Sequence, residues 1–317
     1  MNSLDNYIIT HTNSNSYFQI GDIHFEDEIN LKQEVVQYIR INKIDSISIT
    51  YLNSFTKMNS EFLKQIPWTK NLIIIKLDLN LNGLQYLTEL EFLHVEPNNS
   101  QDIDFSFHNS LKKVSIKWTK GRNSIFKCKS VTDIHLFNYR SNDLSSFINL
   151  SNLNSIGLTI STIKSMFGIE LLATKLKCVS LRYCSKLEDL SPLKKLTGLN
   201  KLELFSIPKL TSLSFLINST IQIIGIEKCK SIKDINHVFS LKNLKVLGLI
   251  DSVPFTSISE IPKLSNLESF YIGHTNIIDG DLKPLLNLKN LKRCFITNRK
   301  HYNLKNSDIK LILNIKD

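Results

Sequence analysis

Five cysteines and eight histidines are the side chains of this 317-residue protein that could act as nucleophiles, acid–base groups or metal ligands. The cysteines are Cys128, Cys178, Cys184, Cys229 and Cys294, and no two of them form a C-x-x-C pair. A reactive thiol needs a neighbouring base, and a zinc site needs several such ligands grouped together. The sequence also lacks the H-E-x-x-H, EF-hand, P-loop and G-x-S-x-G motifs. We therefore expect a protein that is not an enzyme and holds no metal or cofactor.

The cellular compartment is indicated by the same cysteines and by the N-terminus. An odd number of cysteines without a recognisable framework is typical of a reducing compartment. The segment MNSLDNYIITHTNSNSYFQI has no basic region followed by an apolar stretch, so we expect no signal peptide. No run of eighteen apolar residues occurs, so we expect no membrane span. These features predict a cytoplasmic protein with five free thiols.

A frame of three apolar residues recurs along the chain, in the order apolar, two variable residues, apolar, one variable residue, apolar. From Leu90 onward its starting points are separated by 21, 20, 22, 23, 23, 22, 23, 23 and 24 residues, after two first steps of 28 and 18. Such a period indicates stacked repeats rather than two ordinary domains. We number the residues of each unit from its first apolar residue. The frame begins at Ile44, Leu72, Leu90, Leu111, Val131, Leu153, Leu176, Leu199, Ile221, Leu244, Leu267 and Leu291.

Each frame predicts a short strand that begins at its third residue. Alternate residues of a strand point to opposite faces, so the fourth and sixth residues enter the core and the third, fifth and seventh face solvent. We therefore predict parallel strands at residues 46–49, 74–77, 92–95, 113–116, 133–136, 155–158, 178–181, 201–204, 223–226, 246–249, 269–272 and 293–296.

The clearest units are LKCVSLRYCSKLEDLSPLKKLTG from Leu176 and IQIIGIEKCKSIKDINHVFSLKN from Ile221. They resemble the leucine-rich-repeat family, whose consensus is L-x-x-L-x-L-x-x-N/C-x-L, and Cys184 and Cys229 stand at the Asn/Cys position. The resemblance covers about residues 44 to 298. It implies an α/β solenoid, a horseshoe of about twelve repeats with a parallel sheet on the concave side and short helical or irregular segments on the convex side.

The open ends of such a stack need covers, so we divide the chain into an N-terminal cap (1–43), leucine-rich repeats (44–298) and a C-terminal cap (299–317). Within the first cap, YFQIGDIHF reads as a strand. Residues 28–40 are expected to form a helix, because Ile29, Val35 and Ile39 share one helical face.

The concave positions place the cysteines and histidines too far apart for chemistry. Cys178 should lie beside Lys201, whose ammonium could lower the pKa of the thiol. No histidine lies in register beside that thiol, and His135 is two strands away. His94 and His135 share one position with Ser115 between them, at a separation of about 10 Å that is too large for one metal ion.

Aromatic side chains at the variable positions are the more informative feature of the concave face. Aromatic side chains dominate interface hot spots, and Gly157, Gly225 and Gly248 at strand midpoints leave room for a partner's side chain. Phe295 belongs to the same exposed set. We predict that the partner contacts Phe92, Lys117, Trp118, Phe137, Arg182, Tyr183, Phe205 and Tyr271, with Lys117 and Arg182 as polar anchors.

The formal net charge of +10 could indicate a nucleic-acid partner. However, the five variable positions of the twelve units hold eleven basic and nine acidic residues, a net charge of +2. The excess lysines therefore lie mainly on convex segments such as SPLKKLTG and on the termini. A nucleic-acid site needs a concentrated basic stripe, so we expect no nucleic-acid partner and no membrane partner.

The expected function is a non-catalytic module that binds another protein on its concave face and is a monomer when free. A bacterial toxin-immunity protein and a signalling adaptor or scaffold are two versions of it. The alternative is the substrate-recognition subunit of a ubiquitin ligase, because VSLRYCSKLEDL is similar to the cysteine-containing repeats of F-box proteins. That alternative lacks an F-box pattern in the N-terminal segment. An enzyme and a nucleic-acid-binding protein rank below both.

Overall fold

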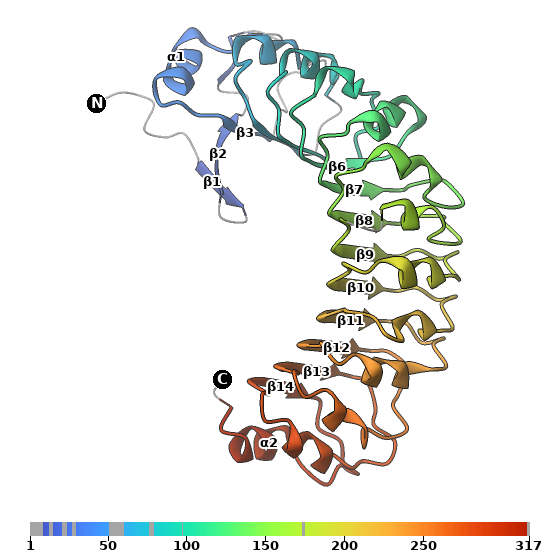
Figure 1. Ribbon diagram of the computed structural model, residues 1–317. Coiled ribbons are helices and arrows are strands. Elements are labelled where there is room, and N and C mark those ends of the chain that lie inside the picture. Colours follow the sequence, from blue (N-terminus) through green and yellow to red (C-terminus); the bar gives the residue numbers. More distant parts are fainter. Residues whose placement is uncertain are drawn as a thin grey trace. The chain divides into compact units, whose positions relative to one another are not determined.

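The computed structural model describes residues 9–12, 15–20, 24–26, 30–50, 60–75, 79–96, 98–172 and 175–315. The chain divides into two compact units. The first comprises Met1–Tyr139 with Asn149–Leu153, and the second comprises Arg140–Ile148 with Asn154–Asp317. In each unit, strands lie side by side on one face and 3₁₀ segments lie on the other (Figure 1).

The first unit begins with an antiparallel hairpin, and the strands from β2 to β7 then pair in parallel in chain order. Helix α1 spans Gln33–Ile41 between β2 and β3. The strands are β1 (Ile9–Thr12), β2 (Asn15–Ile20), β3 (Ser46–Ile49), β4 (Asn71–Ile74), β5 (Phe92–Val95), β6 (Lys113–Lys117) and β7 (Asp133–Phe137). The 3₁₀ segments are η2 (Ser60–Gln65), η3 (Asn82–Tyr86), η4 (Phe105–Phe107) and η5 (Lys120–Lys127).

The second unit contains strands that alternate with 3₁₀ segments and ends in helix α2 (Asn306–Ile312). Its strands are β8 (Ser155–Thr159), β9 (Cys178–Arg182), β10 (Lys201–Phe205), β11 (Ile223–Glu227), β12 (Val246–Ile250), β13 (Ser269–Gly273) and β14 (Arg293–Ile296). The 3₁₀ segments are η7 (Ile169–Leu172), η8 (Ser191–Lys195), η9 (Ser214–Leu216), η10 (Ile235–Ser240), η11 (Ile261–Lys263) and η12 (Lys283–Asn287), while η6 (Ser145–Asn149) precedes β8 in the sequence.

The apolar frame forms the core of each unit. In the repeat that begins at Leu176, the first, fourth and sixth residues are buried, with exposed fractions of 1% or less. The sixth residue, Leu181, lies in register with Leu158 on one side and Leu204 on the other. Because the same position repeats on each strand, apolar side chains stack along the sheet and no single repeat has to bury its own. Apart from the second, each predicted strand begins at the predicted residue.

The second predicted strand, 74–77, is wrong in register. Strand β4 spans Asn71–Ile74, and Leu72 pairs with Ile47 and Leu93, which are the fourth residues of their repeats. The frame therefore begins at Thr69 instead of Leu72. Thr69 is fully buried and its hydroxyl donates to the Ile66 carbonyl at 2.8 Å, so a polar residue occupies an apolar position without an unpaired group. The first steps become 25 and 21 residues (69 − 44 and 90 − 69).

The N-terminal helix also begins later than predicted. Residues 27–29 lie outside the described part, and α1 begins at Gln33, because Leu31 forms an antiparallel bridge with Phe25. The Leu31 amide donates to the side chain of Gln65 at 2.8 Å. From Gln33 onward the helix buries Val35, Val36 and Ile39, as the apolar spacing required. At the other end of the chain, α2 buries Ile309, and Asn306 accepts a hydrogen bond from the Ile296 amide at 2.9 Å.

A left-handed residue follows each strand of the second unit from β8 to β13. The eighth residue of each repeat has a φ between 45° and 57°, and it is Ile160, Tyr183, Ser206, Lys228, Asp251 and His274 in turn. Its amide still donates across the sheet, as Tyr183 does to the Phe205 carbonyl at 2.8 Å. The ladder of hydrogen bonds therefore gains one bond beyond the strand, and the chain then turns towards its 3₁₀ side.

Ile160 is the poorest side chain for this left-handed position, because a β-branched Cβ crowds the carbonyl there. Replacing Ile160 with Asn should raise the free energy of unfolding by about 1 kcal/mol, since a left-handed L-residue costs about 1–2 kcal/mol and Asn tolerates it best after Gly. The measurement is a urea denaturation midpoint. Ile278→Asn is the matched control. The exposed fraction of Ile278 is 55%, close to the 54% of Ile160, but its φ is not positive. Equal shifts in both variants would contradict the strain argument.

Candidate protein-binding surface

The solvent side of the strands carries the predicted binding residues, and we call it the sheet face. On each strand the third, fifth and seventh residues point to this face, and their neighbours across the sheet occupy the same positions. Rows of equivalent side chains therefore run across the strands. In the second unit, one row of seventh residues contains Arg182, Phe205, Glu227 and Ile250.

Arg182, Tyr183, Phe205 and Lys228 form one cluster on the sheet face of the second unit, and we call it the Phe205 cluster. The rings of Tyr183 and Phe205 meet edge to face with centroids 4.8 Å apart. The Arg182 guanidinium lies 5.5 Å and the Lys228 ammonium 5.2 Å from the centroid of the Phe205 ring. Tyr183 is 50% exposed, so the cluster offers an aromatic surface and two cations to solvent.

The backbone fixes the cluster in place. Tyr183 and Lys228 both occupy the left-handed eighth position, with φ values of 54°. Their side chains therefore leave the chain where the strand has just ended, on either side of Phe205. Each cation over the ring contributes about 0.5–1 kcal/mol at an exposed site. The predicted residues Arg182, Tyr183 and Phe205 thus lie together.

Lys228 was absent from the predicted binding residues, although it contacts the same ring. Its type and position in the repeat were visible in the sequence, since Lys228 and Tyr183 are both eighth residues. The direction of its side chain was not visible, because it depends on the left-handed backbone at that position.

In the first unit, the predicted residues Lys117, Trp118 and Phe137 are partly occupied by contacts within the unit. The indole of Trp118 meets the ring of the buried Tyr139 edge to face at 5.5 Å and donates to Asn123 at 3.1 Å. The Phe137 ring stacks on His135 with centroids 4.5 Å apart. The Lys117 ammonium donates to the Ser100 hydroxyl at 2.8 Å. Removing Trp118 therefore also removes packing, which makes Tyr183 the cleaner residue for a binding test.

Phe92 and Tyr271 lie apart from these two groups. Phe92 begins β5 and is half-buried beside Lys113 of β6. Tyr271 is the central residue of β13, between Gly248 and Phe295 in register. Phe295 is 52% exposed. Tyr271 and Phe295 therefore extend the aromatic part of the sheet face towards the C-terminal end of the second unit.

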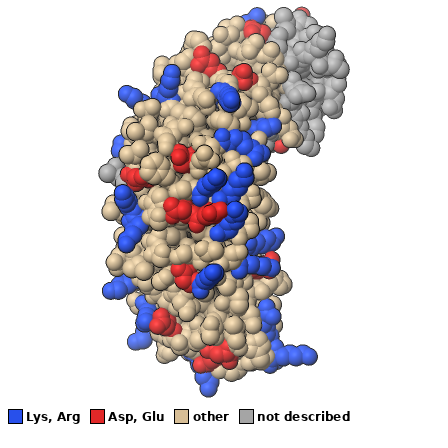
Figure 2. All heavy atoms as spheres, turned by 90° about the vertical axis from the view of Figure 1, so that its right-hand side faces the viewer, with Lys and Arg blue, Asp and Glu red and all other residues tan. Residues whose placement is uncertain are grey.

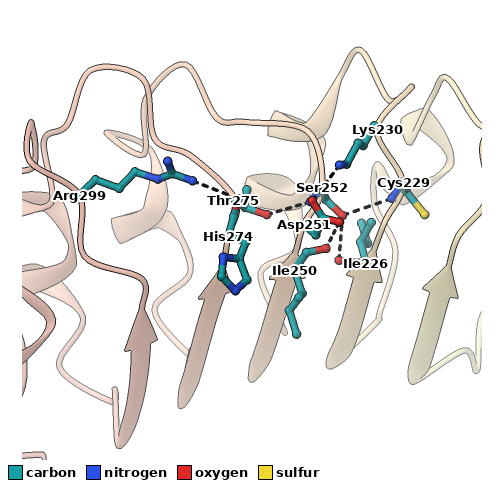
Figure 3. A network of polar contacts seen from close by, with 9 residues as sticks. All are labelled: Ile226, Cys229, Lys230, Ile250, Asp251, Ser252, His274, Thr275 and Arg299. Atoms are coloured by element: carbon teal, nitrogen blue, oxygen red, sulfur yellow. Dashed lines mark hydrogen bonds and ion pairs between the residues drawn. The ribbon is translucent and has the colours of Figure 1, made fainter.

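The ninth residues of the repeats form a polar ladder beneath this surface, not a reactive centre (Figure 3). The Ser252 hydroxyl accepts from the Cys229 amide at 3.4 Å, and the Thr275 hydroxyl accepts from the Ser252 amide at 3.0 Å. The Ser252 hydroxyl in turn lies 3.1 Å from the Ile226 carbonyl. The side chains of Ser252 and Thr275 thus serve backbone groups of the neighbouring repeat, and they stand at the repeat position that Cys184 and Cys229 also occupy.

Burial holds the thiols of the structural cysteines in the protonated form. It raises the pKa of Cys184 and of Cys229 to about 11, and that of Cys294 to about 12. Burial, together with a smaller contribution from the nearby Asp104 carboxylate, raises the pKa of Cys128 to about 11. A protonated thiol is a weak nucleophile and a poor metal ligand.

The remaining candidate groups lie as the repeat frame predicted. Cys178 pairs in register with Lys201, and His94, Ser115 and His135 occupy one row across β5, β6 and β7. Burial lowers the pKa of His94. In the part of the chain that the structure describes, no three His, Cys, Asp or Glu side chains are grouped so that they could hold a metal ion.

Thiol reactivity tests this description of the cysteines. At pH 8, Cys184, Cys229 and Cys294 should react with a disulfide reagent at least tenfold more slowly in the native protein than in urea, because a pKa of about 11 or 12 leaves about a hundredfold less thiolate, or less still, than in an exposed thiol. In urea without reductant, five thiols should react, and elemental analysis should find no stoichiometric zinc. Three thiols or fewer in urea would reveal a disulfide and contradict the prediction.

Figure 2 shows the opposite face, which carries the 3₁₀ segments, with Lys and Arg side chains interspersed among Asp and Glu. Exposed ion pairs occur between repeats, such as Lys209 with Glu188 at 2.8 Å. Lys194 and Lys195 of η8 are exposed there. Basic residues on this face are thus mixed with acidic ones, and Lys194 and Lys195 provide control positions remote from the Phe205 cluster.

Among the described residues, no helix has the length and apolar character needed to cross a membrane. No family model matches the sequence, and no curated protein sequence matches it.

Solved structures with the same fold do match. An internalin (inlF) from Listeria monocytogenes is 19% identical with a TM-score of 0.61, over 84% of this chain and 79% of that one. The leucine-rich-repeat protein LIC12759 from Leptospira interrogans is 17% identical with a TM-score of 0.50, over 84% and 75% of the two chains. TLR13, solved in complex with ssRNA13, is 18% identical with a TM-score of 0.54, over 87% of this chain and 43% of that one.

These likenesses agree with the parallel strands and the 3₁₀ segments of this chain. By its fold, this protein is a leucine-rich-repeat solenoid.

Proposed function

We propose that this chain is a non-catalytic protein-binding module that recognises a partner protein on its sheet face, with the Phe205 cluster as the main anchor. The observation that carries the proposal is the exposed aromatic pair Tyr183 and Phe205, flanked by the cations of Arg182 and Lys228. Aromatic and arginine side chains dominate the binding energy of protein interfaces. The polar and charged groups beside them suit a partner that carries acidic and apolar side chains together.

The partner's own activity distinguishes two uses of this surface. If the partner is a toxin whose activity is lost on binding, the chain is an immunity protein. If binding leaves the partner active and recruits a third protein, the chain is an adaptor. A ubiquitin-ligase recognition subunit has no structural observation in its favour.

A nucleic-acid partner is disfavoured by the charges beside the cluster. Glu203 lies two residues before Phe205 on β10, Glu227 lies in register between Phe205 and Ile250, and Asp251 follows β12. Carboxylates at these positions would repel phosphate groups, whereas a nucleic-acid surface concentrates Lys and Arg. TLR13 is a structural neighbour that was solved with RNA, so RNA binding is included as an outcome of the test below.

Substitution of the anchor should weaken partner binding without unfolding the chain. Tyr183→Ser is suitable, because Ser206 occupies the equivalent left-handed position with the same φ of 54°. Loss of an aromatic hot spot costs about 2 kcal/mol or more, so Tyr183→Ser should weaken binding at least tenfold. The control carries Lys194→Ala and Lys195→Ala on the 3₁₀ face and should bind like the wild type.

The measurement has two steps. Wild type, Tyr183→Ser and the lysine control are used to capture proteins from cells of the source organism, and a protein retained by the control but lost with Tyr183→Ser is then purified. Its affinity for the three chains is measured by calorimetry. If the lysine control loses the protein while Tyr183→Ser keeps it, the partner binds the 3₁₀ face and the proposed binding surface is wrong. If only RNA is captured, the protein-binding proposal fails.

A further inference from the structure

A small notch lies beside the Phe205 cluster on the sheet face of the second unit. Gly225 and Gly248 are neighbours in register at the centres of β11 and β12, and their backbones form its floor. The notch has a volume of about 120 Å³. That is the space of about four water molecules, and it suits one side chain. Its walls include Arg182, Glu203, Phe205, Glu227 and Ile250.

The fold does not require glycine at either position of the floor. A Cβ on Gly225 would meet its nearest neighbour at 4.0 Å, and one on Gly248 at 3.9 Å, which are ordinary contacts. Gly83 differs, since a Cβ there would come within 1.8 Å of the Ser60 carbonyl, and Gly280 has a positive φ of 67°. Glycine weakens a strand interior, so two adjacent strand glycines without a steric or conformational reason indicate that the open space itself is used.

The walls of the notch carry two carboxylates, Glu203 and Glu227, and one guanidinium, Arg182, so carboxylates outnumber cations there although the chain as a whole is basic. Glu227 lies in register between Phe205 and Ile250, so both of its neighbours in that row are apolar. Ion pairs near the notch join Glu203 to Lys201 and Asp251 to Lys230, and within the described residues none involves Glu227. On β12 the solvent-facing residues Val246, Gly248 and Ile250 carry no charge.

We infer that the notch receives one basic side chain, an arginine or a lysine, from the partner protein. The inference deepens the proposed function by naming the chemistry that the partner presents at this point. The aliphatic stem would lie over the glycine backbones and against Ile250, and the charged end would reach Glu227. Basic side chains suit this arrangement because their stems are apolar and only their ends are charged.

Other occupants fit the notch less well. An apolar side chain would cover the carboxylate of Glu227 without pairing it, and an unpaired buried charge is unfavourable. An acidic side chain would face two carboxylates, Glu203 and Glu227, against one guanidinium, Arg182. Arginine has the further advantage of a planar guanidinium that can bind a carboxylate with two hydrogen bonds.

The test uses the full chain with ¹⁵N-labelled glycine, since ten glycines give few amide signals in an NMR spectrum. The probes are N-acetyl-arginine amide, N-acetyl-lysine amide and N-acetyl-leucine amide. The arginine or lysine probe should shift the Gly225 and Gly248 signals saturably, and the leucine probe should not. The affinity for the basic probe, obtained from these shift changes, should be at least fivefold lower in Glu227→Gln. A stronger response to the leucine probe, no response to either basic probe, or an unchanged response in Glu227→Gln overturns the inference.

Filling the notch gives a second test that uses the captured partner. Gly248→Val should bind that protein at least tenfold more weakly while its melting temperature equals or exceeds that of the wild type, because valine favours a strand. Gly273→Val is the control, since Gly273 ends β13 outside the notch and a Cβ there makes only ordinary contacts. An unstable Gly248→Val would show that the glycine is structural and overturn the inference.

The two proposals can fail separately. If the partner binds Gly248→Val normally but loses Tyr183→Ser, the notch inference is wrong and the protein-binding proposal stands. If no protein depends on Tyr183, the proposed function fails, whereas the probe experiment still decides whether the notch accepts a basic side chain.

Discussion

Register between parallel strands is the constraint on which the rest of the structure depends. A single repeat has three apolar frame residues and cannot bury them alone, so each must lie against the same residue of the next repeat. Leu181, for example, has Leu158 and Leu204 as neighbours in register. The same register that aligns the core also aligns the solvent-facing residues. A feature of the sheet face is therefore set by which residues adjacent repeats place at one position.

Two consequences of this register meet at the Phe205 cluster. The seventh residues of adjacent strands lie side by side, so Arg182 reaches the ring of Phe205. The eighth residues are left-handed and still bonded to the next strand, so Tyr183 and Lys228 are held on either side of that ring. The cluster is preorganised by backbone hydrogen bonds, which reduces the entropy that binding would otherwise cost. The ladder of Cys229, Ser252 and Thr275 supports the turn that follows each strand.

The sequence predicted what depends on the apolar period and missed what depends on polar or local exceptions. Strand starts from β5 to β14 agree with the structure because apolar residues recur at fixed positions. The frame failed at Thr69, where a buried hydroxyl bonds locally and no apolar residue marks the position. Helix α1 began late because Leu31 pairs with Phe25, a contact that helical periodicity does not report. Lys228 was missed because side-chain direction follows from φ, and Ile160 shows that the residue type does not reveal a left-handed position.

The glycines fall into two groups, those that the backbone requires and those at which a larger side chain would fit. At Gly83 and Gly280 the backbone leaves no alternative, because a Cβ would collide or φ is positive. At Gly225 and Gly248 a larger side chain would fit, and valine or isoleucine would strengthen the strand. The neighbouring positions of the same strands do hold such residues, namely Ile223 and Val246. Two glycines in register therefore weaken the sheet at one point and open the notch that Glu203, Glu227 and Arg182 line.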